Sequence, residues 1–363
     1  MKRQLAGRAL TEFQKRLLTW FRTHQRDLPW RTSREPYRIW VAEIMLQQTR
    51  IAAVTPYYER FLEYFPTVES LAAAPQQEVL KLWSGLGYYS RARNLHLAAK
   101  RIVTEHAGKF PRTHDAALEL PGIGAYTAAA VLSIAYDAPL AVLDGNVARV
   151  LARIHAVRGD LRVPRTWRAL TETAHQLLAR KTASDWNQAL MELGEVICTP
   201  KSPRCLVCPV VQSCRAFAEG ITNEIPEPRK KRTPVAMTIA AVILLDPKGR
   251  TLLVRDPGAH DEVLFSRMWQ FPAIHVSREA RPELEKYFAE TFGVKKLTLE
   301  ELPPARHGVT FRNITLLPFL ARVTKLPVVQ RSRTLALKSL GNVPVSSATK
   351  KLAAAVADAI SKA

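Results

Sequence analysis

The spacing of apolar residues divides the chain into a long helical part and a shorter part with strands. Over residues 11–214, apolar side chains recur at three and four positions, and glycine, proline and short polar turns interrupt them. This pattern predicts an all-α body. After residue 234 it changes to β-branched runs, VAMTIAAVILL and then TLLVR after a DPKG turn. Helical stretches near 278–292 and 348–363 complete a predicted α+β domain.

A short segment between these parts is rich in proline and basic residues. Residues 220–234 combine three prolines with the run RKKR, which predicts an extended, solvated linker. A nuclear-targeting signal is an alternative for the run, although a basic linker beside DNA is the simpler account. The expected domains are residues 1–219 and residues 235–363.

The charge of the chain points to a polyanionic partner. Lys and Arg number 53 against 32 Asp and Glu, a formal net charge of +21, which favours nucleic acid. A membrane surface is the rival partner, but no run approaches the roughly 20 apolar residues of a spanning helix, and the N-terminus lacks the apolar core of a signal peptide. We therefore expect an intracellular protein of the cytoplasm or nucleoid.

All four cysteines fall within 17 residues, which indicates a metal centre because a reducing compartment disfavours disulfides. They are Cys198, Cys205, Cys208 and Cys214, with the spacing C-x6-C-x2-C-x5-C. Four thiolates can hold either zinc or a [4Fe-4S] cluster, and the chemistry alone does not choose between them.

The segment LPGIGAYTAAAVLSI places a tight turn between two helical stretches within residues 114–135. Gly122 and Gly124 can adopt positive φ and leave backbone N–H groups bare at the start of the second helix, where the dipole favours a DNA phosphate. An ordinary packing corner between helices is an equal alternative for the segment alone. The strong positive charge favours the phosphate site.

Glu43 lies in a helix, PYRIWVAEIMLQQT, that is apolar on nearly every side. Burial beside Ile39 and Trp40 should raise its pKa, and an acid protonated near neutrality can give its proton to a leaving base. The alternative is an ion pair with a buried arginine. The adjacent Gln47 and Gln48, uncharged hydrogen-bonding residues suited to base edges, favour the catalytic role.

Asp144 directly precedes a helix with an apolar stripe, so it is predicted to be the N-cap of that helix. The backbone donors and the helix dipole should lower its pKa and keep it ionised. One neutral carboxylic acid and one charged carboxylate are the pair that cleavage of a glycosidic bond through a cation-like transition state requires. The capping and catalytic interpretations are compatible.

Aromatic and basic residues alternate in WSGLGYYSRARNL. Trp83, Tyr88 and Tyr89 can be core residues, the commoner fate of an aromatic cluster. A glycine-flanked tyrosine near arginines also suits insertion into a base stack, since an enzyme that acts on a base must extrude it and fill the gap.

Together these motifs resemble the MutY-type adenine glycosylases of the helix-hairpin-helix, endonuclease III superfamily, over nearly the whole chain. The matching stretches are LPWR, the block from Glu43 through MLQQT, GLGYYSRARNL, LPGIGAYTA, LDGNVARVLAR, MELGEVICT and the cysteine spacing. The resemblance implies a mostly α helix-hairpin-helix body with a [4Fe-4S] loop at 198–214 and an α+β Nudix-like C-terminal domain. It implies a monomeric base-excision enzyme that removes adenine mispaired with 8-oxoguanine or guanine from double-stranded DNA.

The resemblance also implies roles for individual residues. Glu43 protonates the adenine ring, Asp144 supports the oxocarbenium-like sugar, and Tyr126 and Asn146 support this catalytic pair. Arg31 lines the adenine pocket. The positions matched to DNA contacts, with Gln48 and Tyr88 as the wedge, are Gln48, Leu86, Tyr88, Gly122 and Gly124. Lyase members carry a nucleophilic lysine where Tyr126 stands, so we expect a monofunctional glycosylase that leaves the abasic site uncut.

The chain departs from the Nudix hydrolases in one respect and from the family pattern in two. The helix near 278–294 lacks most of the paired acids of Nudix hydrolases, so we expect no nucleotide hydrolysis. Where the family usually has Phe-Ser-His for oxidised guanine, this chain has Val309, Thr310 and Phe311, and only Thr310 keeps a hydroxyl. We therefore expect weaker discrimination of 8-oxoguanine, or discrimination by other residues. Ala148 replaces a common lysine, and we expect catalysis to survive.

Three other functions compete with this interpretation. An endonuclease III-like lyase is disfavoured by Tyr126 and by the C-terminal domain. A noncatalytic DNA-binding protein is disfavoured by Glu43 and Asp144. A ferredoxin-like electron carrier explains the cysteines but leaves the hairpin, the charge and the carboxylates unexplained.

Overall fold

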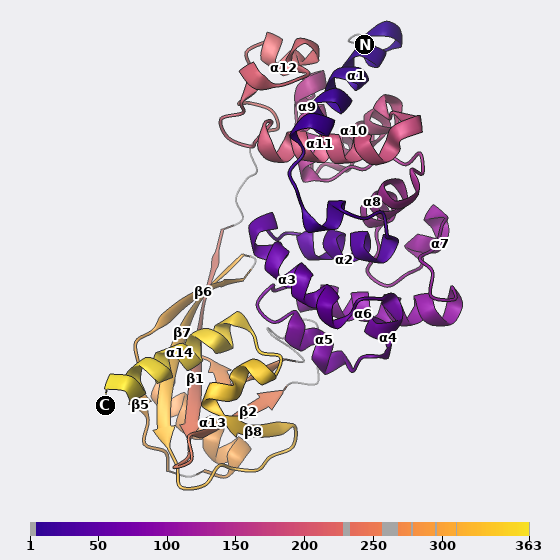
Figure 1. The fold of residues 1–363 in the computed structure, drawn as a ribbon. Helices are drawn as coiled ribbons and strands as arrows, with labels where there is room; N and C mark the ends of the chain where they lie inside the picture. The colour runs from indigo at the N-terminus through magenta and orange to yellow at the C-terminus, as the bar shows by residue number, and fades with distance from the viewer. Residues whose placement is uncertain are drawn as a thin grey trace. The chain divides into compact units, whose positions relative to one another are not determined.

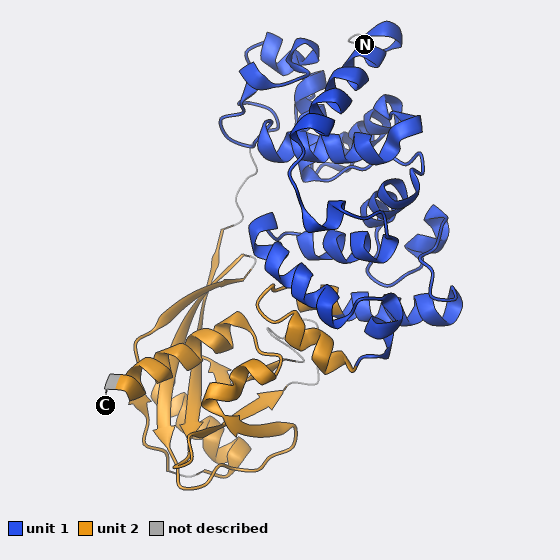
Figure 2. Ribbon diagram, in the orientation of Figure 1, with its two compact units in different colours: residues 1–74, 93–230 blue, residues 75–92, 231–363 orange. Residues whose placement is uncertain are grey.

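The computed structural model describes residues 5–227, 233–255, 268–276, 279–294, 296–309 and 311–362. The chain forms two compact units, coloured separately in Figure 2: residues 1–74 with 93–230, and residues 75–92 with 231–363. Among the described helices, none combines the length and the apolar character needed to cross a membrane.

The first unit is built from helices (Figure 1). They are α1 (Gly7–His24), α2 (Pro36–Leu46), α3 (Ile51–Tyr64), α4 (Val68–Ala73), α6 (Tyr89–Glu105, which begins in the second unit), α7 (His114–Leu118), α8 (Ala125–Tyr136), α9 (Gly145–His155), α10 (Pro164–Leu177), α11 (Ala183–Val196) and α12 (Arg215–Ala218). Short 3-10 helices join them: η1 (Pro29–Arg31), η2 (Arg180–Thr182), η3 (Cys205–Val207) and η4 (Val211–Ser213).

Two helices at the centre of this unit position the functional side chains. Helix α2 packs against α3 and α8, and nearly all of its residues are buried, as its lack of a polar face predicts. Helix α11 packs against α1, α8 and α9. Polar side chains on α2 and α11 are therefore held in largely apolar surroundings.

The second unit combines helices with two β-sheets. Its elements are α5 (Gln76–Leu82), β1 (Val235–Leu245), β2 (Arg250–Arg255), β3 (Trp269–Gln270), β4 (Ala273–His275), α13 (Ala280–Phe292), β5 (Glu300–Glu301), β6 (Ala305–Val309), β7 (Arg312–Arg322), β8 (Ser332–Ala336), η5 (Leu337–Asn342) and α14 (Ser347–Lys362). One sheet has the order β4-β1-β7-β5, with β6 also paired to β7, and the other has the order β3-β2-β8.

Strand β1 is a nearly continuous apolar run, and from Ala240 to Leu245 it is buried because helices cover both faces of its sheet. Strand β1 runs parallel to β7, from the pair Val235 and Arg312 to the pair Leu245 and Arg322. The side chains of one face pack with α14, coloured yellow in Figure 1, and those of the other face pack with α13. Burial on both faces accounts for the continuous apolar run. The predicted fold class, a helical body with an α+β C-terminal region, is confirmed.

The first part of the predicted linker is packed rather than solvated. Ile225 is 1% exposed, and its carbonyl accepts a hydrogen bond of 2.7 Å from Nε of Arg153. The prediction of an extended linker is therefore wrong near Ile225, because this residue completes the core beside α9. The basic run at 229–232 lies outside the described residues, and the domain boundaries stay a prediction.

Candidate active site

A pocket of about 610 Å³ in the first unit brings together residues from separate parts of the sequence. Its lining includes six residues proposed above: Arg31, Glu43, Gln48, Tyr126, Asp144 and Asn146. They come from η1, α2 and the turn after it, α8 and the start of α9. The size is typical of a site for a small organic group such as a nucleobase.

Glu43 is a buried residue in the lining of this pocket. Its residue is 7% exposed, and Tyr126 Oη donates a hydrogen bond of 2.8 Å to Glu43 Oε2. Burial raises the pKa of Glu43 to about 7, although the Tyr126 hydroxyl acts in the opposite direction. The charge of Asp144 raises this pKa further. Glu43 can therefore hold a proton near neutral pH, as predicted.

Asp144 caps α9, but its pKa moves in the direction opposite to our prediction. The backbone N–H of Val147 donates to Asp144 Oδ1 at 2.7 Å, which is the expected capping bond. Burial nevertheless raises the pKa of Asp144, because desolvation of the carboxylate outweighs the backbone donors and the charge of Arg149. The predicted lowering was wrong because the local sequence does not reveal how deeply tertiary packing buries a cap.

Asn146 is held between α9 and α11. Its Oδ1 accepts a hydrogen bond of 2.9 Å from Nη2 of Arg149, and its Nδ2 donates to Glu195 Oε2 at 3.4 Å. A Cβ at Gly194 would lie 3.0 Å from the Cβ of Asn146, so the two helices approach closely at this glycine. The donor on one side and the acceptor on the other fix which way the Asn146 amide points.

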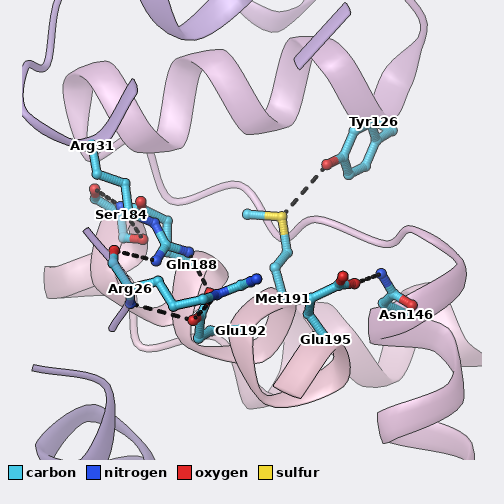
Figure 3. Close-up of polar contacts among 9 residues, drawn as sticks. All are labelled: Arg26, Arg31, Tyr126, Asn146, Ser184, Gln188, Met191, Glu192 and Glu195. Atoms are coloured by element: carbon cyan, nitrogen blue, oxygen red, sulfur yellow. Dashed lines mark hydrogen bonds and ion pairs between the residues drawn. The ribbon is translucent and has the colours of Figure 1, made fainter. Parts of the chain in front are cut away.

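One face of α11 forms a wall of the pocket that sequence reasoning missed. This wall consists of Gln188, Met191, Glu192 and Glu195, which repeat at helical spacing (Figure 3). The signal was present in WNQALMELGEV, where polar residues recur on one side of an otherwise apolar helix. No local motif marked them as functional.

Glu192 joins two arginines at this wall. It is 1% exposed and accepts hydrogen bonds of 2.7 and 3.0 Å from Arg26 and of 2.7 Å from Arg31 (Figure 3). Burial alone would raise the pKa of Glu192, but the two guanidinium groups outweigh burial and hold that pKa below its usual value. The side chain of Arg31, itself 12% exposed, is thereby fixed at the pocket.

The proposed DNA-contacting residues fall in both units. In the first unit, Gln48 is exposed and has a left-handed backbone conformation, with φ of 57°. In the second unit, Tyr88 is 41% exposed with φ of 47°, whereas Leu86 is only 8% exposed. Thr310 lies outside the described residues, in the connection between β6 and β7.

The glycine turn between α7 and α8 is exposed at both glycines. Gly122 has φ of 77°, and a Cβ there would lie 2.6 Å from the Cβ of Asn94, so a side chain is excluded on two grounds. Gly124 is the N-cap of α8 and leaves that helix start without a side-chain cap. Bare N–H groups at an exposed helix start can bind an anionic oxygen.

The four cysteines line one small cavity beside α9. The rest of the lining is mainly apolar, and Arg153 Nη1 donates to Cys198 Sγ at 3.3 Å. As the described side chains stand, no three of the Cys, His, Asp and Glu residues are arranged to hold a metal ion. The donor set itself, four sulfurs with a cation beside them, fits a cluster that takes only thiolate ligands.

Comparison with known proteins places these features in context. Residues 41–177 match the family described as HhH-GPD superfamily base excision DNA repair protein. The adenine DNA glycosylase of Mus musculus is 32% identical over 404 aligned positions, which cover 94% of this chain and 77% of the mouse protein. The adenine DNA glycosylase of Rattus norvegicus is 44% identical over 229 residues, 60% of this chain but only 44% of the rat protein.

A solved structure agrees with the helical unit. The structure of a thermostable thymine-DNA glycosylase is 32% identical, with a TM-score of 0.53, and the match covers 58% of this chain and 97% of that chain. The similarity therefore takes in nearly the whole of a protein that consists of little more than such a helical unit.

Proposed function

Because this chain belongs to the adenine DNA glycosylases, within the HhH-GPD superfamily of base excision DNA repair proteins, we propose that it removes adenine mispaired with 8-oxoguanine or guanine in DNA. The reaction is hydrolysis of the N-glycosidic bond. The observation that carries the proposal is the buried pair formed by Glu43 and the Tyr126 hydroxyl, in one pocket with Asp144.

The raised pKa of Glu43 supports its role as the acid. A pKa of about 7 leaves much of this group protonated near neutrality, so it can protonate a ring nitrogen of adenine as the bond to the sugar breaks. Asp144, ionised, then stabilises the cation-like sugar. Water finally adds to the sugar carbon by a retaining route. Asn146 supports the pair from its fixed position beside Asp144.

Recognition of the adenine would come from the walls of the same pocket. Arg31 offers donors to ring acceptors, and Glu192 holds its guanidinium in place. Gln188, a half-buried member of the α11 wall, carries an amide that can pair with a base edge. Tyr126 occupies the position of the lyase lysine, so no Schiff base forms and the abasic strand stays intact.

Binding to duplex DNA would combine charge, the glycine turn and the wedge. The net charge of +21 supplies attraction to phosphates, and Gly122 and Gly124 expose the start of α8 to one of them. Gln48 and Tyr88, both exposed with positive φ, would insert into the duplex. We propose that the protein acts on DNA as an intracellular monomer, with the C-terminal Nudix-like domain reading the base opposite adenine.

The four cysteines would hold a [4Fe-4S] cluster. Their shared cavity and the cation of Arg153 support this choice over an all-protein core. When bound, the cluster would tie the segment after α11 to α9, and it takes no part in the proton transfer described above. Equal amounts of iron and acid-labile sulfide, four of each per chain, would support it, whereas zinc would contradict it.

The function is tested by single-turnover adenine release from duplexes with adenine opposite 8-oxoguanine, guanine or thymine. We expect release opposite 8-oxoguanine and guanine, with strand breaks only after alkali. Glu43→Gln should bind the same duplexes but release almost no adenine, and Glu63→Gln, an exposed acid on α3, should match the parent. Absence of release from every duplex despite tight binding would instead indicate a noncatalytic DNA-binding protein.

A further inference from the structure

The segment that carries Tyr88 belongs to the same compact unit as the C-terminal residues. Residues 75–92 group with residues 231–363, although they lie far apart in the sequence (Figure 2). Helix α5, the turn after it and the start of α6 therefore belong to the same compact unit as the α+β elements. Within this unit, hydrogen bonds join residues 84–89 to the segment just before α14.

The Tyr88 turn has an uncommon backbone conformation. Tyr88 has φ of 47°, and Gly85 and Gly87 have φ of 115° and 74°. Only glycine adopts this region freely, so at Tyr88 the surrounding structure must compensate for the conformational strain. The result is a Tyr88 side chain that is 41% exposed, two residues after the buried Leu86.

Contacts within the turn account for part of that support. The indole Nε1 of Trp83 donates to the carbonyl of Gly87 at 3.1 Å. The guanidinium of Arg91 lies 5.6 Å from the ring centre of Trp83 and 5.2 Å from that of Tyr88. These contacts shape the turn, but they involve only residues of the turn and its flanks.

The carbonyl of Val345 holds the turn from both sides. It accepts a hydrogen bond of 2.7 Å from Ser84 Oγ and one of 3.2 Å from Tyr89 Oη. Lys350 Nζ donates to the Ser84 carbonyl at 3.2 Å. Ser84 precedes the turn and Tyr89 follows Tyr88, so one buried acceptor fixes both ends. A carbonyl oxygen has two lone pairs, and this one can use both.

Val345 is itself anchored to a sheet. It forms a parallel bridge with Trp269, and the N–H of Trp269 donates to the carbonyl of Pro344 at 2.9 Å. Val345 is also fully buried. The acceptor therefore cannot follow the turn if the turn moves, and it acts as a fixed point on the α+β part of the unit.

We propose that the Val345 bracket, the carbonyl of Val345 with its donors Ser84 and Tyr89, is a positioning device that holds Tyr88 ready to enter the base stack. This inference rests on the proposed function, since it assigns the wedge to Tyr88. It gives residues of the α+β part a role in extruding the adenine that is separate from reading the opposite base. Ser84 and Tyr89 are thus positioning residues, which act through Tyr88.

The test compares binding of full-length variants that all carry Glu43→Gln, so that affinity is measured without chemistry. The bracket is removed by Ser84→Ala with Tyr89→Phe, and the wedge by Tyr88→Ala. Each duplex contains an adenine mispair and carries 2-aminopurine beside the base opposite the adenine. The fluorescence of 2-aminopurine reports unstacking of the bases. The matched control is Ser361→Ala with Tyr64→Phe, which removes two hydroxyls at exposed positions.

Removal of the bracket should weaken binding about tenfold and should reduce the 2-aminopurine signal, because it removes both hydrogen bonds to the Val345 carbonyl and the one of 3.3 Å that Tyr89 Oη accepts from the Gly85 N–H. In the Tyr88→Ala background the same removal should have little further effect, because its target is already gone. An equal tenfold loss with and without Tyr88 would overturn the proposal, as would an unchanged fluorescence signal in the bracket variant.

A single substitution keeps the proposal testable if the double bracket variant fails to fold. Tyr89→Phe alone keeps the ring and should give a smaller loss with the same dependence on Tyr88. Failure of this proposal can also be distinguished from failure of the proposed function. Failure of the parent, with Glu43 present, to release adenine would refute that function, whereas coupling between the bracket and Tyr88 is read from binding and fluorescence alone.

Discussion

Replacing Glu43 by Gln should abolish activity and, at alkaline pH, stabilise the fold. Burial raises the pKa of Glu43 from its usual 4.5 to about 7. Each unit of this shift corresponds to about 1.4 kcal/mol between the protonated and ionised states. The ionised group therefore lowers the free energy of unfolding by about 3 kcal/mol once it is charged in both states. Gln, which carries no charge, avoids this loss.

The pH range of the effect follows from the two pKa values. Below pH 4.5 the group is protonated in the folded and the unfolded protein, and its burial carries no penalty from charge. As the pH rises from 4.5 to about 7, the unfolded chain ionises while the folded protein holds the proton, so stability declines. The advantage of Gln over Glu should be less than about 1 kcal/mol at pH 5 and about 3 kcal/mol at pH 8.

Urea denaturation at pH 5 and pH 8 measures this difference. The seven tryptophans supply the fluorescence signal, and among them Trp40 and Trp186, both fully buried, report unfolding of the helical unit. Comparison of variant and parent at each pH cancels the other titrating groups. Glu105→Gln is a control in which the pKa shift has the opposite sign, because the hydrogen bond from Arg101 lowers the pKa of Glu105. Replacement of this carboxylate should not stabilise the protein at pH 8.

The reasoning would be refuted if Glu43→Gln changed the free energy of unfolding equally at pH 5 and pH 8. Such a result would mean that Glu43 is not desolvated enough to retain its proton in the folded protein. The acid role in the proposed mechanism would then lose its physical basis, even if the variant were inactive.

Two further variants test the neighbours of this group. Tyr126→Phe removes the hydroxyl that lowers the pKa of Glu43. The pH at which the single-turnover rate falls on the alkaline side should therefore rise by about one unit. No shift, or a shift to lower pH, would contradict the assigned hydrogen bond. Glu192→Gln leaves Arg26 and Arg31 without their buried counter-charge, and should reduce adenine release at least tenfold and the free energy of unfolding by about 3 kcal/mol. Urea denaturation checks the second effect, and unchanged stability would show that the ion pairs are not formed in solution.

The two carboxyl groups could be found from the sequence because each stands in a distinctive local pattern. Glu43 interrupts a helix that is apolar on nearly every side, and Asp144 stands directly before a helix whose apolar stripe begins at Val147. Both patterns are local, so they survive without knowledge of the fold. The strand run that became β1 was recognisable for the same reason.

The remaining parts of the site depend on contacts between distant segments. Glu192 functions through Arg26 and Arg31, which lie more than 160 positions earlier in the chain. The pKa of Asp144 was predicted in the wrong direction because desolvation is set by tertiary packing and not by the cap itself. The packing of residues 75–92 with the C-terminal region is likewise invisible to periodicity.

The charge of Asp144 helps the pocket to keep a proton on Glu43 near neutral pH. Asp144 accepts a backbone hydrogen bond that favours its ionised form, whereas the hydrogen bond to Glu43 comes from a single hydroxyl. The charge of Arg149 also favours the ionised form of Asp144, the form that the proposed mechanism requires. The negative charge of Asp144 then raises the pKa of Glu43, so the proton of Glu43 is lost with more difficulty. The coupling widens the pH range in which one acid and one carboxylate coexist, and this is the state that can protonate the base while stabilising a cationic sugar.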